Sequence, residues 1–267
     1  MPGETHRAVA INVGANTTLP GFRGPIYPDG SFEYVPIPER EPTDPDAAVP
    51  TYADLAPHLQ VSVPGELLDR RVHLDPEFAT YPLCERYTYG DEHGVKAGPL
   101  SGLDPGDRLY FYATLSTVDP AELDGDWLAD EDADGDPGGR RPGDWIPPRW
   151  GAYLIGHFEV ARVVTGDAYA ALSPEERRPF ANNAHVKRQT VDAEAFVLGT
   201  DDSRLYDRAV PLSTPAAGGE ATEVVTRLSN DSGRGPWWRR VLRFEPAAAA
   251  ELAATVEERS RAGSAGT

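Results

Sequence analysis

Runs of hydrophobic residues along the chain predict more strand than helix. Residues 8–13 (AVAINV) are almost continuously apolar, which is typical of a short buried strand. Two longer runs rich in aromatic and β-branched residues, 103–115 and 152–164, predict central strands, and the turn sequence LDPGD leads into the first of them. Shorter runs predict an edge strand that ends in prolines at 31–39 and further strands at 194–199, 208–213 and 222–228.

Helices are predicted at three places. The T-x-x-D sequence that opens residues 51–59 and the S-P-x-E sequence that opens residues 173–180 resemble the capping boxes that begin helices. The alanine-rich stretch 245–261 predicts a terminal helix, and the chain is expected to fray from about residue 262.

Together these elements predict one α+β domain over residues 1–267. Strands dominate the middle of the chain without a regular alternation of strand and helix. A mixed, strand-rich sheet or a partly closed barrel, with flanking helices and a C-terminal helix, is therefore favoured over a doubly wound sheet. An acidic loop insertion at about 119–149 separates the two longest strands.

The acidic insertion contains part of a calcium-binding sequence. Asp130, Asp132, Asp134 and Gly135 match the first ligand positions and the glycine of an EF-hand loop, but Arg141 stands where the loop requires a glutamate. We therefore expect a solvated acidic loop without a tight calcium site.

The composition indicates a soluble protein. Hydrophobic residues make up 40% of the chain, which is enough for a sizeable core, and the single cysteine, Cys84, excludes an internal disulfide or a cysteine cluster for zinc. No apolar run approaches the ~20 residues of a membrane helix, and the N-terminal sequence lacks the pattern of a signal peptide. A cytoplasmic location without membrane contact is expected.

The charge pattern indicates the salt concentration in which the protein works more than the partners that it binds. The chain has 43 acidic residues against 25 lysines and arginines, and only Lys96 and Lys187 are lysines. Dense carboxylates with arginine in place of lysine favour a halophilic, archaeal source, because molar salt shortens the Debye length to ~3 Å and screens the repulsion. The alternative is an acidic protein of a GC-rich organism at low salt. In either case binding to a nucleic acid would depend on local contacts, since long-range attraction would be weak.

Common catalytic and nucleotide-binding motifs are absent from the sequence. It has no GxGxxG after the first strand, no GxxxxGK[ST], and no GxSxG, HExxH or CxxC. The six histidines show no paired spacing that would place two of them on one face of an element. No metal site is therefore predicted, and no cofactor is indicated.

Two acidic stretches, LDPEF and YTYGD, are candidates for acid–base chemistry. In an extended chain Asp75 and Glu77 lie on one face, as a pair of catalytic carboxylates requires. Tyr89 and Asp91 add an aromatic ring and a third carboxylate. The alternative is an acidic loop before a turn.

The sequence NNAHVKR carries one of the two lysines. Read as a strand, it places Asn183, His185 and Lys187 on one face, opposite the apolar residues between them. An amide can read a base, an imidazole can move protons, and an ammonium group can meet a phosphate. We expect this face to share a pocket with Tyr89 and Asp91. The alternative is an ordinary polar strand edge.

The segment GRGPWWRRVLRF interleaves aromatic and basic residues without an acid. This composition suits stacking on bases and contact with phosphates, but a tryptophan pair before a terminal helix also predicts core packing beneath arginine stems. The candidate nucleic-acid contacts are Arg234, Trp237, Trp238, Arg239 and Arg240.

Taken together, several segments resemble the nucleotide modification associated domain family, third type. The family is associated with systems that modify bases in DNA, and the resemblance therefore implies a protein that acts on or recognises a modified base. It also implies nucleotide or DNA, and other proteins of a modification system, as partners. The segments that carry the resemblance follow one another along most of the chain, at 24–39, 74–78, 87–91, 106–115, 153–160, 183–188 and 203–213.

The resemblance extends the list of candidate residues. Through its segments it adds Tyr34, Arg188, Ser203 and Arg204 to the candidates for substrate binding. Three interpretations stay open: an enzyme that acts on a nucleotide or base, a non-catalytic module that binds a modified base, and a structural partner in a modification complex.

A second resemblance concerns the middle of the chain. The strand pair 106–115 and 153–164 is similar to that of PUA-like barrels, which bind modified or flipped bases. A likeness of fold alone does not establish this function.

Overall fold

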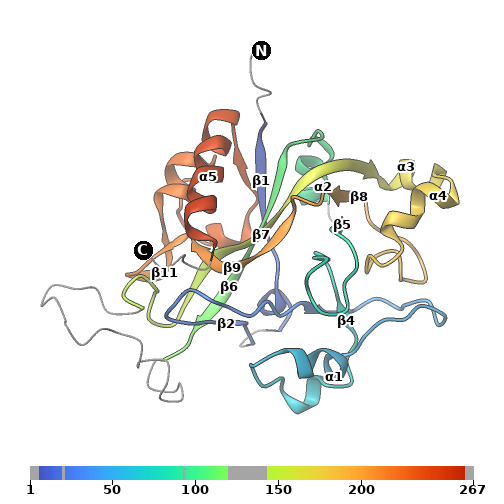
Figure 1. The fold of residues 1–267 in the computed structure, drawn as a ribbon, viewed down its shortest axis with the longest axis horizontal. Coiled ribbons are helices and arrows are strands. Elements are labelled where there is room, and N and C mark those ends of the chain that lie inside the picture. Colours follow the sequence, from blue (N-terminus) through green and yellow to red (C-terminus); the bar gives the residue numbers. More distant parts are fainter. Residues whose placement is uncertain (1–5, 20–21, 93, 120–142, 262–267) are drawn as a thin grey trace, which may run out of the picture.

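An open, mixed sheet of eight strands lies at the centre of the protein (Figure 1). The computed structural model describes residues 6–19, 22–92, 94–119 and 143–261. The sheet has the order β12-β1-β6-β7-β8-β5, and β2 pairs with β6 while β9 pairs with β7. The strands are β1 (Ala8–Asn12), β2 (Pro25–Ile26), β5 (Thr88–Asp91), β6 (Arg108–Thr117), β7 (Trp150–Thr165), β8 (Ala195–Gly199), β9 (Arg204–Pro211) and β12 (Leu242–Phe244).

The two long strands β6 and β7 connect the parts of the sheet. They pair with each other in antiparallel orientation, whereas β1 and β2 run parallel to β6. The far end of β7 continues past β6 and pairs with β8, which in turn pairs with β5. This extension of β7 places β5, the strand that carries YTYGD, at the end of the sheet path.

Alternation along the strands divides the core into two layers. Val9 and Ile11 of β1 face one layer, whereas Ala8 and Ala10 face the other. The second layer is covered by α5 (Pro246–Arg259), the red helix in Figure 1. The first layer is covered by the irregular chain between β1 and β6, which brings in many aromatic side chains.

Short elements complete the fold. The helices α3 (Gly166–Ala171) and α4 (Pro174–Arg177) follow the end of β7. Tyr169 of α3, and Phe180 of the 3₁₀ helix directly after α4, pack against Phe196 of β8. Two small sheets pair β3 with β4 and β10 with β11. The strands of these sheets are β3 (Ile37–Pro38), β4 (Val72–His73), β10 (Ser213–Thr214) and β11 (Ala217–Ala221). Two further short helices are α1 (Tyr52–Leu55) and α2 (Gly94–Ser101).

The predicted α+β class is confirmed. Both predicted capping boxes are present, at Thr51 before α1 and at Ser173 before α4. The predicted strands 8–13, 103–115 and 152–164 correspond to β1, β6 and β7. Within the described ranges the sheet order is an open path, so the protein has the mixed sheet and not the partly closed barrel.

Two predicted strands are wrong or incomplete. Residues Val224–Leu228 form a π-helix. Val224, Val225 and Leu228 are buried against α5 and β11, and a helical turn places all three on that one side, which a strand would not. In 31–39 only Phe32 bridges to β2, and only Ile37–Pro38 pairs as a strand. The prolines in this segment lack the N–H that a longer ladder needs.

Part of the predicted insertion can be placed. Its calcium-like sequence, like the tail from residue 262, lies outside the described residues. Residues 143–149 pack on the domain: Ile146 is buried, and Trp145 Nε1 donates to the Pro28 carbonyl at 3.1 Å.

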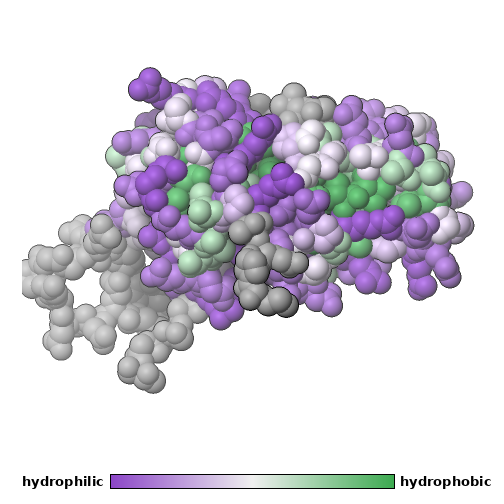
Figure 2. Space-filling model, turned by 90° about the horizontal axis from the view of Figure 1, so that it is seen from above, coloured by the Kyte–Doolittle hydropathy of each residue, from purple (hydrophilic) through white to green (hydrophobic). Residues whose placement is uncertain are grey.

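The surface is largely hydrophilic on the side shown in Figure 2. Among the described residues, Leu83 and Val191 are the large apolar side chains with the most exposure. None of the helices in the described ranges combines the length and apolar character needed to cross a membrane.

Candidate functional site

The carboxylate of Asp75 lies at the centre of a buried polar cluster. Asp75 follows β4 and lies beside β5, whose Gly90 N–H donates to Asp75 Oδ1 at 3.0 Å and Oδ2 at 3.1 Å. Asn183 Nδ2 donates to Oδ1 at 3.0 Å. These donors fix the orientation of a carboxylate that is only 6% exposed.

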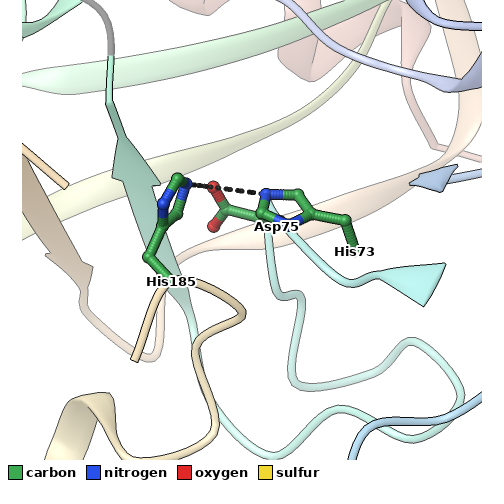
Figure 3. A group of neighbouring side chains, drawn as sticks. All are labelled: His73, Asp75 and His185. Atoms are coloured by element: carbon green, nitrogen blue, oxygen red, sulfur yellow. Dashed lines mark ion pairs between the residues drawn. The ribbon is translucent and has the colours of Figure 1, made fainter. Parts of the chain in front are cut away.

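Two histidines face Asp75 from opposite sides (Figure 3). His185 Nε2 lies 3.5 Å from Asp75 Oδ2, and His73 Nε2 lies 3.8 Å from the same oxygen. The two imidazole rings meet edge to face with their centroids 4.9 Å apart. Both histidines are buried, and they come from segments more than a hundred residues apart in the sequence.

A carboxylate orients each imidazole from behind. His73 Nδ1 lies 2.6 Å from Glu39 Oε2, and His185 Nδ1 lies 2.8 Å from Asp192 Oδ1. Because a carboxylate only accepts hydrogen bonds, each Nδ1 carries a hydrogen and each Nε2 is directed toward Asp75. Arg188 joins the two sides through ion pairs with Glu39 and Asp192.

These contacts change the proton affinities of the cluster. Burial lowers the pKa of His185, but hydrogen bonds to Asp192 and Asp75 outweigh it and raise the pKa to about 9. Burial raises the pKa of Asp192, but the bond from His185 brings it down to about 2. Burial also raises the pKa of Glu39, yet the bond from His73 holds it well below its usual range. At neutral pH, His185 is therefore an imidazolium between two carboxylates.

The cluster forms the floor of a cavity of about 390 Å³. A second polar group faces the same cavity: Tyr89 Oη donates to Asp91 Oδ2 at 2.6 Å, and Lys96 Nζ lies 3.3 Å from that oxygen. The lining residues are Asn12, Val13, Gly14, Thr17, Thr18, Ile37, Pro38, Arg40, Glu41, His73, Asp75, Tyr89, Gly90, Asp91, Glu92, Lys96, His185 and Arg188.

The NNAHVKR sequence reaches this cavity as a turn, so the predicted strand is wrong. Asn183 Oδ1 accepts a hydrogen bond from His185 N at 3.0 Å, and the Asn183 carbonyl accepts from Val186 N and Lys187 N. Asparagine favours such turns because its side chain satisfies the backbone locally. Alternation of side chains across a strand therefore does not apply.

Five of the sequence candidates come together at the cavity. Asp75, Tyr89, Asp91, His185 and Arg188 all line it. Asn183 donates to Asp75 and is itself fully buried. A pocket shared by His185, Tyr89 and Asp91 was expected, but it depends on a turn and not on a strand face.

Glu77 and Lys187 lie elsewhere. Glu77 is fully buried and accepts hydrogen bonds from Glu85 N at 2.7 Å and Thr88 Oγ1 at 2.8 Å, so it secures a loop. The chain bends at Pro76, which separates Glu77 from Asp75. Lys187 Nζ donates to Asn182 and is not part of the cavity lining.

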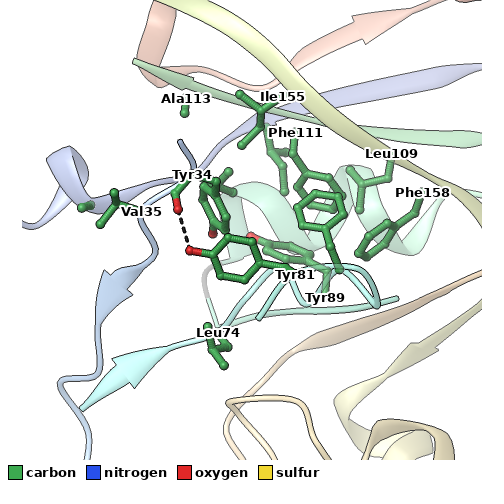
Figure 4. Packing of buried hydrophobic residues seen from close by; sticks show 14 of the residues in the cluster. Tyr34, Val35, Leu74, Tyr81, Tyr89, Leu109, Phe111, Ala113, Ile155 and Phe158 are labelled. Carbon is green, nitrogen blue, oxygen red and sulfur yellow. Dashed lines mark hydrogen bonds between the residues drawn. The ribbon is translucent and has the colours of Figure 1, made fainter. Parts of the chain in front are cut away.

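Tyr34 belongs to the aromatic core (Figure 4). It is 2% exposed, its carbonyl accepts from Tyr81 Oη at 2.6 Å, and its ring packs edge-on against Phe78. The predicted role of Tyr34 in stacking on a base is not compatible with this burial. Tyr89 also turns its ring into the core, against Phe111, and only its hydroxyl serves the polar group.

Ser203 and Arg204 lie apart from the cavity. Ser203 is buried and its Oγ accepts from Glu159 N at 3.1 Å, next to the start of β9. Arg204 pairs with Glu257 of α5 at 2.7 Å. Ser203 therefore joins the start of β9 to β7, and Arg204 joins β9 to α5. Arg188 lines the cavity, but its guanidinium group is already occupied by carboxylates.

The tryptophan–arginine segment is a packing element and not an open platform. Trp237 is fully buried, and its Nε1 donates to the Gly219 carbonyl at 2.9 Å. Trp238 is half-buried and packs edge-on against Trp150, while Arg240 pairs with Asp231 at 2.9 Å. Arg234 and Arg239 are exposed at the surface.

Several residues of the site were not singled out by sequence reasoning. His73 stands two residues before Asp75, and that spacing in HLDPEF was the available signal. Lys96, which was noted only for its rarity, is the lysine that lines the cavity. Glu39 and Asp192 carry no sequence signal, because their role comes from contacts across the fold.

The cluster has the composition of a metal-binding group. One ligand atom each from His73, Asp75 and His185 lies within 4.8 Å of the others, and Glu92, His185 and Asp192 form a second such group. The expectation of no metal site considered only pairs of histidines on one element, whereas this pair comes from separate segments.

Comparison with known proteins identifies the family. No curated protein and no solved structure matches the chain at a significant level. The family model described as nucleotide modification associated domain 3 matches residues 7–258, which include both small sheets, the eight-stranded sheet and every residue of the cavity. The chain belongs to the nucleotide modification associated domain 3 family.

Proposed function

We propose that this protein is an enzyme that acts on a base in DNA or on its nucleotide, and that the cavity above Asp75 is its active site. The observation that carries the proposal is the convergence of His185, Asp75 and Asp91 in one cleft. Family membership supplies the association with nucleotide modification. The cavity volume of about 390 Å³ suits a small ligand such as one nucleotide or one flipped base.

The polar character of the cavity favours catalysis over passive recognition. A module that reads a modified base commonly stacks that base on an exposed aromatic ring. Among the described lining residues, Tyr89 is the only aromatic residue besides the two histidines, and its side chain is buried against Phe111. Titratable groups that lie in a cleft beside opposite charges are instead typical of sites where side chains transfer protons.

Two groups have distinct roles in the proposed reaction. His185, held as an imidazolium by Asp75 and Asp192, is placed to donate a proton to the substrate. Asp91, with Tyr89 and Lys96 beside it, is placed to accept one. Lys96 also provides the ammonium group that a phosphate would contact, a role that the sequence had suggested for Lys187.

Mass spectrometry of nucleosides tests the proposal. Genomic DNA is compared between cells with the wild-type gene, cells without it, and cells that carry Asp91→Asn or His185→Gln. Lys187→Ala is the matched control, because this lysine lies away from the cavity lining. We expect the modified nucleoside to be lost without the gene and in both cavity variants, and to remain in the control.

The same experiment distinguishes the alternatives. If both cavity variants fold, as thermal unfolding reports, and still leave the modified nucleoside at its wild-type level, the cavity is not an active site. If DNA containing the modified base then binds to the wild-type protein, recognition is the function instead.

A further inference from the structure

Three acceptor atoms converge on one point at the floor of the cavity. With a hydrogen on each Nδ1, the neutral form of each imidazole presents the lone pair of Nε2 toward Asp75 Oδ2, at 3.5 Å for His185 and 3.8 Å for His73. The longer separation exceeds a hydrogen bond. Between such lone pairs a cation is needed: in the imidazolium form of His185 it is the proton on Nε2, and in the neutral form a metal ion can take its place.

The separations are close to those of a coordination sphere. Metal–ligand bonds of about 2.0–2.1 Å in tetrahedral geometry place neighbouring ligand atoms about 3.3 Å apart. The three ligand atoms here lie within 4.8 Å of one another, so small side-chain shifts are sufficient to close them around an ion.

The surroundings of the three ligands are those of a preorganised metal centre. A histidine that binds a metal commonly donates its other ring N–H to a carboxylate, which fixes the tautomer and the ring. Glu39 does this for His73 at 2.6 Å, and Asp192 does it for His185 at 2.8 Å. Gly90 N and Asn183 Nδ2 hold the Asp75 carboxylate in the same way.

The local charge favours a cation. The carboxylates in contact with the two imidazoles are those of Glu39, Asp75, Glu92 and Asp192, and Arg188 is the guanidinium group that pairs with three of them. A divalent ion would compensate the excess of negative charge that remains when both imidazoles are neutral.

We propose that His73, Asp75 and His185 bind one divalent transition-metal ion at the floor of the cavity. Two imidazoles and one carboxylate suit ions such as Zn²⁺ or Fe²⁺, whereas Mg²⁺ and Ca²⁺ prefer oxygen ligands alone. Three protein ligands leave further coordination positions open toward the cavity, as in catalytic centres. The catalytic consequence rests on the proposed function: the ion would replace the proton on His185 Nε2, and a water molecule polarised by the ion would then donate the proton beside Asp91.

A second candidate group shares His185 but is less suitable. Glu92, His185 and Asp192 would bind through the opposite ring nitrogen, Nδ1. Arg188 already pairs with both of these carboxylates and lies 3.2 Å from His185 Nδ1. A guanidinium group at that place repels a second cation.

Metal titration of the full-length protein tests the proposal. The protein is freed of metal with a chelator and titrated with Zn²⁺ in excess Mg²⁺, which occupies nonspecific acidic sites. Co²⁺ gives an absorption spectrum that reports nitrogen ligands. We expect one Zn²⁺ per chain, a rise in the thermal unfolding temperature, and loss of both effects in His73→Gln and Asp75→Asn. Asp192→Asn should weaken binding by about 10–100-fold without abolishing it.

The control is His58→Gln, which changes an exposed histidine and should bind like the wild type. No stoichiometric Zn²⁺ in the wild type, or unchanged binding in a folded His73→Gln variant, overturns the proposal. Loss of binding in Asp192→Asn together with normal binding in His73→Gln also overturns it, because the ion would then occupy the second group.

The outcomes separate this site from the proposed function. If the ion binds as described while Asp91→Asn leaves the modified nucleoside unchanged, the metal site stands and the proposed function fails. If no ion binds while Asp91→Asn and His185→Gln remove the modified nucleoside, the function stands without the metal.

Discussion

Gly90 is the residue that lets the NNAHVKR turn approach β5. A Cβ atom at this position would lie 2.7 Å from His185 Cδ2 and 3.2 Å from Asn183 Oδ1. His185 cannot move aside freely, because Asp192 and Asp75 hold both ring nitrogens. The absence of a side chain at residue 90 therefore permits the contacts of Asp75 with both the strand and the turn.

Gly90→Ala should therefore destabilise the protein and disturb the cluster. We expect a loss of about 1–3 kcal/mol in the free energy of unfolding, measured with urea, as is usual for overpacking in a tight interior. Gly65→Ala is the control, since no atom lies within 4 Å of its added Cβ, and it should change stability by less than about 0.5 kcal/mol. Equal effects of the two substitutions would contradict the steric argument.

His157 gives a second prediction at the scale of single residues. It is buried beside Tyr206, and burial, with the charges of Arg108 and Arg204, lowers its pKa to about 3. The unfolded chain takes up this proton near pH ~6.5, whereas the native chain does not until about pH 3. The group therefore contributes stability above pH ~6.5, and that contribution is lost as the pH falls toward 3.

Between pH ~6 and pH ~5 the other shifted histidine has a smaller effect. His185, whose native pKa is raised to about 9, is already protonated there in the native state, so its contribution is small and opposite in sign. Lowering the pH from about 6 to about 5 should cost the wild type about 1 kcal/mol of unfolding free energy through His157. Urea denaturation of His157→Gln at both pH values should show this part of the slope removed. An unchanged slope would mean that His157 does not titrate as its burial implies.

At the scale of elements, local sequence accounts for what local interactions decide. The capping boxes at Thr51 and Ser173 depend on residues three apart, and the strands β6 and β7 depend on long aromatic and β-branched runs. Each of these elements was predictable. The helix α2 was not, because GVKAGPLS contains two glycines and a proline and its helical form is imposed by packing on β7 and β8.

The candidate site was only partly predictable for the same reason. Asp75, Asp91 and His185 could be selected because their segments carry unusual polar residues. The pairing of His73 with His185 could not, since it depends on β4 and the NNAHVKR turn meeting across Asp75. Strand alternation failed for this segment because the Asn183 side chain competes successfully for the backbone N–H of His185.

The short 3₁₀ helix Trp237–Arg239 supplies the prediction at this scale. Trp237 is fully buried in the layer beneath α5, whereas Trp238 is half-buried. Trp237→Ala should lower the unfolding free energy by about 3–5 kcal/mol, because it leaves a large cavity and an unpaired Gly219 carbonyl. Trp238→Ala should cost no more than about 2 kcal/mol.

Urea denaturation of the two variants measures this difference. A nucleic-acid platform would behave in the opposite way. Trp237→Ala would then leave the unfolding curve nearly unchanged and weaken binding of a labelled oligonucleotide. That pair of results would restore the segment as a binding surface.

At the scale of the whole molecule, the net charge of -18 sets the response to salt. Exposed ion pairs such as Arg227–Glu251 and Arg7–Asp104 use some of the basic residues, but carboxylates remain in large excess. Salt weakens the attraction within exposed pairs and the repulsion between unpaired acids. Repulsion is the larger of the two because the 43 acidic residues far outnumber the 25 basic residues that could pair with them.

We therefore predict a higher thermal unfolding temperature in about 1 M KCl than in about 0.1 M KCl, over which the Debye length falls from about 10 Å to about 3 Å.

The way in which the unfolding temperature depends on KCl concentration identifies the cause. If screening of the acidic surface is responsible, most of the increase should occur at the lower salt concentrations, where the Debye length changes most. Exclusion of salt from the protein surface would instead give a rise that continues in proportion to concentration. Thermal melts over a series of KCl concentrations, repeated with sucrose as an uncharged excluded solute, separate the two. An unfolding temperature that stays equal or falls in KCl would show that the acidic composition is not an adaptation to molar salt, and the low-salt interpretation of the composition would then hold.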